Sequence, residues 1–165
     1  QRPKKLEQNA LTIPGSRVTY AVGALALWRP SSSPQQIEQL FQQGEFRHFA
    51  IANPKIAPYG VAAMQWLEQS GQLKRLRPKL VYGENIAQTF QFVESGSAGL
   101  GLVALSQVIR SSNYMAIDPR LHQALEQQMV VVKSTRHKLL AQQFTQYLQS
   151  APIRQLIQQQ GYQTP

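Results

Sequence analysis

The fold of this chain is decided between residues 53 and 107, where the sequence reads NPKIAPYGVAA over 53–63 and VYGENIAQ over 81–88. Each segment follows a short apolar run and precedes apolar residues at helical spacing, a pattern that predicts a strand, a turn and a helix. The first N–H groups of a helix have no partner within the helix and carry a partial positive charge. Two such helix starts converging on one cleft would form an uncharged site for an anion.

Strands and helices are expected to alternate along most of the chain. Strands are expected at 17–28 (continuous, or broken at Gly23), 49–52, 80–82, 100–105 and 130–132. Helices are expected from Pro34 to Gly44, from Pro58 to Gly71, from Ile86 to Ser95, over 138–149, and from about Pro152 to Gly161. The stretch 111–119 is expected to be a loop. This alternation predicts an α/β fold with a mostly parallel sheet.

The composition indicates a folded chain. Of 165 residues, 42% are hydrophobic and 15% are charged, which favours a packed core over disorder. The longest apolar run is shorter than the roughly 18 residues that cross a bilayer, and no signal-peptide pattern opens the sequence. Cysteine is absent, which excludes disulfides and thiolate metal sites. Three scattered histidines, His48, His122 and His137, are expected to be surface or structural residues.

The chain carries a net charge of +9. Such a charge is compatible with nucleic acid, an anionic surface or an anionic small ligand. The densest basic group, Lys74, Arg75, Arg77 and Lys79, follows the end of a predicted helix. These cations either complement a helix C-terminus or form a patch for a partner.

Signatures of enzymes are sparse. Neither a phosphate loop ending in Gly-Lys-Ser/Thr nor a Gly-x-Ser-x-Gly elbow occurs, and the acidic residues form no obvious catalytic pair. The glycine-rich run GSAGLG at 96–101 precedes a strand, which favours a tight turn over a dinucleotide site. Glu84, beside a helix start, is expected to stabilise that helix.

The candidate binding residues lie at the two helix starts. The N–H groups of Tyr59, Gly60, Ile86 and Ala87 could face an anion, and Asn85 is expected to cap the second helix. Gly60 has no side chain to block a close approach. Ordinary turns between strands and helices remain the alternative.

Six collinear motifs resemble one protein family over almost the whole chain. They are PGSRVTYA (14–21), NPKIAPYG (53–60), GENIAQ (83–88), FVESG (92–96), GLVALSQ (101–107) and QGY (160–162). In these motifs the chain resembles the molybdate-binding substrate-binding proteins of bacterial ABC importers.

The resemblance implies a type 2 periplasmic-binding-protein-like fold of two lobes. Residues 1–28 would give part of lobe one and a hinge strand, 29–126 lobe two, and 127–165 the return strand and C-terminal helices of lobe one. It also implies a periplasmic protein that is not an enzyme and has no cofactor. Its ligand would be molybdate or tungstate, and its partner the importer's permease rather than nucleic acid.

The resemblance implies an oxyanion held by neutral hydrogen-bond donors, with no metal directly ligated. The donors match the positions of Tyr59 and Ile86, and Gly60, Ala87 and Asn85 lie in the same turns. Cavity size would then set selectivity over sulfate. Some members add a tyrosine hydroxyl where this chain has Ala104, so that contact is lost here, and Ser106 is not carried over as a ligand.

Compared with the family, the resemblance implies that this chain lacks the N-terminal part of lobe one and its hydroxyl-bearing ligands. We therefore expect the isolated chain to bind molybdate weakly, or only as a dimer or with a complementary chain that covers exposed apolar surface. An oxyanion-sensing regulatory domain of the same fold and a remnant with weak binding are the alternatives. No helix-turn-helix supports the regulatory alternative.

Overall fold

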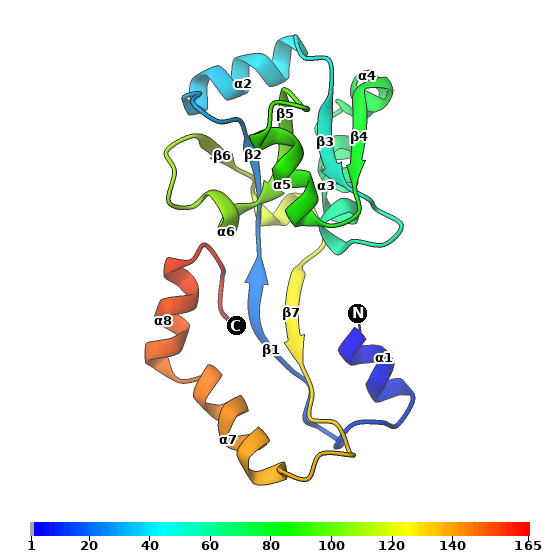
Figure 1. Cartoon of the computed structure of the whole chain (residues 1–165), viewed down its shortest axis with the longest axis vertical. Coiled ribbons are helices and arrows are strands. Elements are labelled where there is room, and N and C mark those ends of the chain that lie inside the picture. Colours follow the sequence, from blue (N-terminus) through cyan, green and yellow to red (C-terminus); the bar gives the residue numbers. More distant parts are fainter. Residues whose placement is uncertain (1) are drawn as a thin grey trace. The chain divides into compact units, whose positions relative to one another are not determined.

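The computed structural model describes residues 2–165, which form two compact units. Unit 2 is the continuous segment Gly23–Leu125, and unit 1 combines the chain up to Val22 with Glu126–Pro165 (Figure 1). The chain therefore passes between the units twice. The lobe boundaries expected from the family resemblance stay a prediction.

Unit 2 is built around a five-stranded sheet in the order β4-β3-β5-β2-β6. The strands are β2 (Leu25–Trp28), β3 (Phe49–Ala52), β4 (Leu80–Gly83), β5 (Leu100–Ala104) and β6 (Tyr114–Ala116). The three neighbours β4, β3 and β5 run parallel, whereas β2 pairs antiparallel with both β5 and β6. The expected α/β class is confirmed, and the sheet is mixed.

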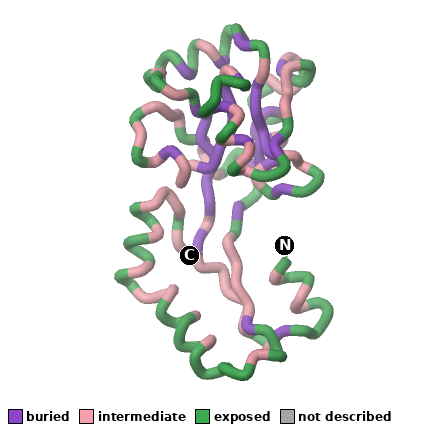
Figure 2. The backbone as a smooth tube through the Cα atoms, viewed as in Figure 1, coloured by how far each residue is buried: buried purple, intermediate pink, exposed green. Residues whose placement is uncertain are grey.

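Alternate residues of the central strands enter two separate cores. One core joins α2 (Pro34–Gln43) and α3 (Pro58–Gln69) to Leu25, Leu27, Phe49 and Ile51. The other core joins α5 (Ile86–Glu94) to Ala26, Trp28, Ala50 and Val103. This two-residue period places helices on both faces of the sheet, and the strands are the most buried part of the unit (Figure 2). The shorter elements are α4 (Leu73–Leu76), η1 (Arg77–Lys79), α6 (Leu105–Val108) and η2 (Pro119–Leu121).

Helix α2 is capped at both ends. Ser33 and Gln36 form a reciprocal capping box at its start, and Gly44 ends it in the left-handed region with φ 69°. Arg75 donates to the carbonyls of Phe41 and Gln42, and Lys79 Nζ donates to the carbonyl of Gly44 at 2.7 Å. Arg75 and Lys79 thus bind carbonyl groups at a helix C-terminus, which agrees with the first of the two interpretations of the basic group. The helix is α2 rather than the one that precedes them in sequence.

Unit 1 is less densely packed. Strands β1 (Val18–Gly23) and β7 (Leu125–Met129), which reach just into unit 2, form a two-stranded sheet. Its helices are α1 (Arg2–Gln8), α7 (Lys138–Leu148) and α8 (Ala151–Gln159). These three helices contain no buried residue within the described range 2–165.

Three expectations differ from the structure. The strand expected at 130–132 is wrong: β7 ends at Met129, and Val132 forms only an isolated bridge with Thr12. The three consecutive valines favour a strand, but pairing with β1 selects the preceding residues. Strand β6 lies inside the stretch expected to be a loop, and α1 was not anticipated. Of the two alternatives for 17–28, the structure has the break at Gly23, because β1 ends there and β2 begins at Leu25.

Candidate functional site

The start of α3 is supported by the loop that leads into it. The carbonyl of Asn53 accepts from the N–H groups of Ile56 and Ala57, and its side-chain oxygen accepts from Lys55 N at 3.0 Å. Pro58 is the first helical residue, where its missing N–H costs no hydrogen bond. Tyr59 follows it in the first turn and is half-buried.

Gly60 lies where α3 packs directly against the end of β3. A Cβ atom at this position would overlap the carbonyl group of Ala52 at the end of β3. Its N–H also donates to the carbonyl of Ala57 at 3.0 Å. Helix packing therefore explains the glycine, and the N–H expected to face an anion is already paired within the turn.

The start of α5 is fixed by its expected cap. Asn85 Oδ1 accepts from the N–H of Gln88 at 3.0 Å, which confirms the predicted N-cap. The Asn85 carbonyl also accepts from both N–H and Oγ1 of Thr89. In return, Gln88 Oε1 accepts from the N–H of Glu84 at 2.7 Å. The side chain of Asn85 is thus engaged in holding the helix.

The sheet places the two helix starts at one edge. Strands β3 and β4 are parallel and in register, with Ala52 opposite Gly83, so both end at the same edge. The N–H of Asn53 donates to the Gly83 carbonyl at 2.7 Å, which ties the two exit loops together. Crevices beyond the carboxyl ends of parallel strands are the usual ligand positions in α/β sheets.

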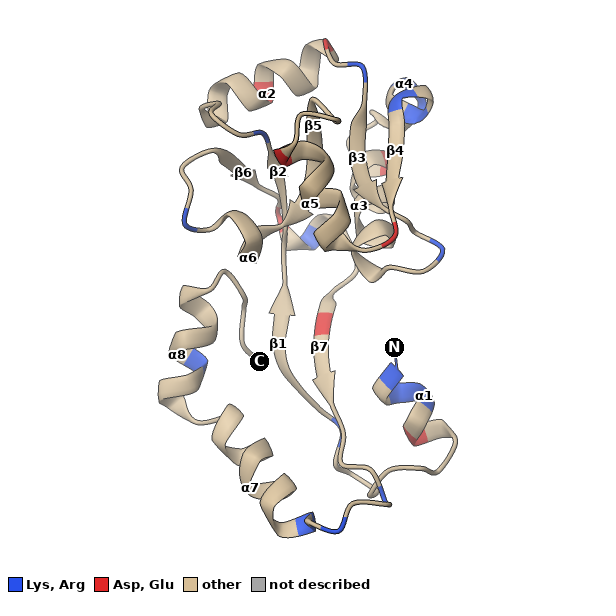
Figure 3. Cartoon of the chain, in the orientation of Figure 1, with Lys and Arg blue, Asp and Glu red and all other residues tan. Residues whose placement is uncertain are grey.

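The donors at this edge belong to the backbone. The first turns of α3 and α5 contain no charged side chain, and neither helix contains lysine or arginine (Figure 3). Within residues 2–165, the N–H groups of Ile86 and Ala87 donate no hydrogen bond. Ala87 is exposed and Ile86 half-buried. The edge therefore offers neutral donors and a helix dipole to an anion.

The side chain of Tyr59 lies beside the two points where the chain enters and leaves unit 2. A Cβ atom on Gly23 would overlap the phenol oxygen of Tyr59 and would lie 3.5 Å from Leu125 Cβ. The absence of a side chain at Gly23 is what makes room for the ring. The start of α3 and both ends of unit 2 are thus packed together.

Sequence reasoning missed one residue of this edge, Gln107. Its Oε1 accepts from Ala104 N at 3.0 Å, and its Nε2 donates to the carbonyl of Ile86 at 3.3 Å. A glutamine three residues after the last residue of a strand, at the third position of a short helix, is the signal that could have found it.

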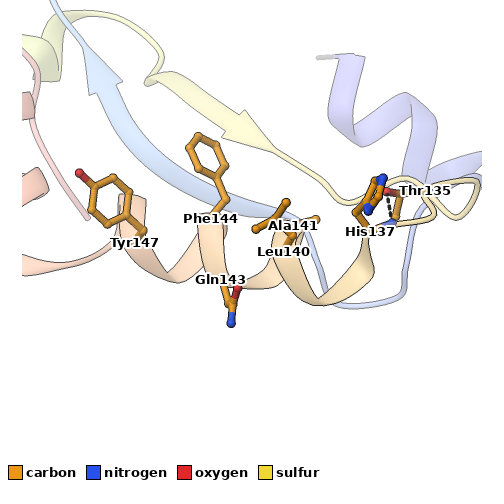
Figure 4. Close-up of a pocket in the computed structure, with 7 residues that line it drawn as sticks. All are labelled: Thr135, His137, Leu140, Ala141, Gln143, Phe144 and Tyr147. Atoms are coloured by element: carbon orange, nitrogen blue, oxygen red, sulfur yellow. Dashed lines mark hydrogen bonds between the residues drawn. The ribbon is translucent and has the colours of Figure 1, made fainter.

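Other parts of the chain offer different surfaces. Around α7, in unit 1, lies a groove of about 600 Å³ (Figure 4), and its lining residues are Thr135, His137, Leu140, Ala141, Gln143, Phe144 and Tyr147. Over residues 2–165, histidine and acidic side chains form no cluster of three suited to a metal ion. No helix in this range is both long and apolar enough to span a membrane.

Almost the whole chain matches one protein family. The family model described as bacterial extracellular solute-binding protein matches residues 1–163. The chain belongs to this family. Unit 2, a mixed sheet with helices on both faces, lies within the matched residues.

Two molybdate-binding proteins are similar to this chain over almost its whole length. The molybdate-binding protein ModA of Azotobacter vinelandii is 38% identical over 168 residues, covering 97% of this chain and 66% of the relative. ModA of Rhodobacter capsulatus is 36% identical, covering 99% of this chain and 66% of the relative. This solute-binding chain thus spans slightly less than two thirds of each.

The fold of this chain is also similar to the solved structure of a molybdate-binding protein. The periplasmic molybdate-binding protein of Azotobacter vinelandii superposes with a TM-score of 0.86 at 34% identity, covering 99% of this solute-binding chain and 74% of the other. The resemblance to molybdate-binding proteins and the periplasmic-binding fold are both confirmed.

Proposed function

We propose that this chain binds molybdate or tungstate as the substrate-binding component of a bacterial ABC importer. One observation carries the proposal: the first turns of α3 and α5, which contain no charged side chain, follow the shared edge of β3 and β4 in a chain 38% identical to a molybdate-binding protein. Backbone N–H groups at such an edge suit a tetrahedral anion that needs no countercharge.

The hydrogen bonds that Gly60 and Asn85 already make support a smaller set of donors than the sequence predicted. We assign donor roles to the backbone N–H groups of Tyr59, Ile86 and Ala87. Gly60 permits α3 to approach Ala52, and Asn85 caps α5, so both residues position the site rather than donate to the anion. Hydrogen bonds from neutral donors bind the anion without a countercharge, and we expect the size of the anion to decide which oxyanion is preferred.

The same proposal implies a cellular location, a partner and a role for the chain. We infer a periplasmic location, delivery of the anion to the importer's permease, and a role in binding rather than catalysis. Lobe two would comprise residues 29–126, and lobe one would include 1–28 and 127–165. Nucleic acid is not part of the proposed function.

A second partner is proposed from the surface of unit 1. Leu140, Phe144 and Tyr147 repeat at helical spacing on α7, line the groove of Figure 4, and are 57–64% exposed. A two-stranded sheet with such helices does not form a core of its own. We infer that a complementary polypeptide, or a second copy, covers this face.

Amide-detected NMR tests the binding function, because it registers weak as well as tight binding at individual residues. Titration with molybdate or tungstate up to millimolar concentration should shift the amide signals of Tyr59, Ile86 and Ala87. Phosphate and sulfate, titrated in parallel, should shift them less. Equal responses to all four anions, or none to molybdate and tungstate, would rule the function out.

A further inference from the structure

The side-chain amide of Gln107 joins two elements that end at the same edge of the sheet. Its Nε2 donates to the carbonyl of Ile86, the first residue of α5, and its Oε1 accepts from the N–H of Ala104, the last residue of β5. The orientation of the amide is fixed by its partners, because Ile86 offers an acceptor and Ala104 offers a donor. Gln107 is half-buried, which shields both bonds from water in part.

We propose that Gln107 is a positioning residue for the anion site, acting through Ile86. This inference rests on the proposed function. The carbonyl of Ile86 belongs to the peptide that follows its Cα, and the N–H of Ala87 belongs to that same planar peptide. Holding the carbonyl therefore also holds the Ala87 N–H direction. Since hydrogen bonds weaken steeply as their angle departs from linear, a tilt of this peptide weakens the hold on an anion.

A local role for Gln107 does not account for both bonds. The bond to Ala104 spans three residues and suffices to start the short helix α6. The bond to Ile86 spans 21 residues and contributes nothing to that helix end. It connects α6 to the first turn of α5. That turn carries the N–H groups of Ile86 and Ala87, which donate no hydrogen bond within residues 2–165. The long-range bond is the one that the site requires.

Two substitutions separate the two bonds. Gln107→Glu keeps an acceptor for Ala104 and removes the donor to Ile86, whereas Gln107→Leu removes both. Gln91→Leu is the matched control, because Gln91 lies on α5, is exposed, and makes no side-chain hydrogen bond within residues 2–165. The melting temperature, the molybdate affinity from amide titration, and residual dipolar couplings of the Ile86 and Ala87 N–H bonds are measured for each variant.

The expected pattern is specific. Both Gln107 variants should lose about 3- to 10-fold in molybdate affinity, the range expected for one net hydrogen bond. Both should also change the dipolar couplings of Ala87, while only Gln107→Leu lowers the melting temperature clearly. Gln91→Leu should change none of these. Because Glu also adds a negative charge, the uncharged Leu variant decides the affinity result.

Two results would overturn the inference. One is wild-type affinity in Gln107→Leu, and the other is unchanged dipolar couplings at Ile86 and Ala87 in both Gln107 variants. Failure of the proposed function looks different, since the wild-type chain itself would then not respond to molybdate. In that case the ligand-free couplings still decide whether Gln107 orients the first turn of α5.

Discussion

The phenol oxygen of Tyr59 occupies the place that a side chain on Gly23 would take. Tyr59 is the second residue of α3, at the candidate anion site, and Gly23 is the residue at which the chain enters unit 2. The two residues are 36 positions apart, so their packing is a tertiary constraint on the site.

Gly23→Ala should displace the Tyr59 ring. We expect unfolding free energy to fall by about 1–3 kcal/mol, the usual cost of overpacking, and molybdate titration to weaken because the α3 start shifts. Urea unfolding followed by circular dichroism measures the first effect. Adding Tyr59→Ala should make the Gly23 substitution nearly neutral, since the clash is then absent. Equal costs in both backgrounds would contradict the contact.

Two substitutions at Asn85 should separate stability from anion binding. Asn85→Ala removes the cap of α5 and should cost about 0.5–2 kcal/mol of unfolding free energy. Asn85→Asp keeps the acceptor and favours the helix dipole, so stability should be retained. Its added carboxylate should repel molybdate, and amide titration should show weaker binding. Undiminished binding by Asn85→Asp would place the anion elsewhere.

The exposed face of α7 should tolerate charge. Phe144→Glu should change unfolding free energy by less than about 0.5 kcal/mol, because the side chain is 57% exposed. It should abolish any self-association or partner binding seen in sedimentation velocity. Leu139→Glu is the matched control on the same helix, since Leu139 is 77% exposed and does not line the groove. If both variants behave alike, the groove is not the interface.

Asp118 provides a prediction for pH. Hydrogen bonds from the Arg120 side chain and then its backbone lower the pKa of the Asp118 carboxyl to about 2. A lowered folded-state pKa stabilises the fold above the unfolded-state value, and this contribution is lost as pH falls toward 2. Arg120→Ala should raise the Asp118 pKa toward its ordinary value in an NMR titration. An unchanged pKa in that variant would show that the ion pair does not form in solution.

Local signals in the sequence were enough to predict most elements of unit 2. Ser33, Gly44 and Asn85 mark helix ends through hydrogen bonds to nearby backbone, and the structure has them in these roles. Residues that depend on tertiary partners were harder to predict. The valines at 130–132 favour a strand on their own, yet pairing with β1 determined β7.

The candidate site also contains residues that local sequence predicts and residues that depend on tertiary partners. The two helix starts were predicted because each is a local pattern, and the register of Ala52 with Gly83 explains why they share an edge. The reason for Gly60 could not be predicted, because it depends on the backbone of Ala52 across the fold. The role of Gln107 was missed since its partner Ile86 is distant in sequence.

The neighbouring ends of unit 2 give it the geometry of a transferable module. A Cβ at Gly23 would lie 3.5 Å from Leu125 Cβ, so the segment begins and ends at nearly one point. A segment whose ends lie close together can be inserted into a surface loop of another protein, or it can be circularly permuted. Unit 2 therefore has the shape required to carry its helix starts, as a cassette, into an unrelated scaffold.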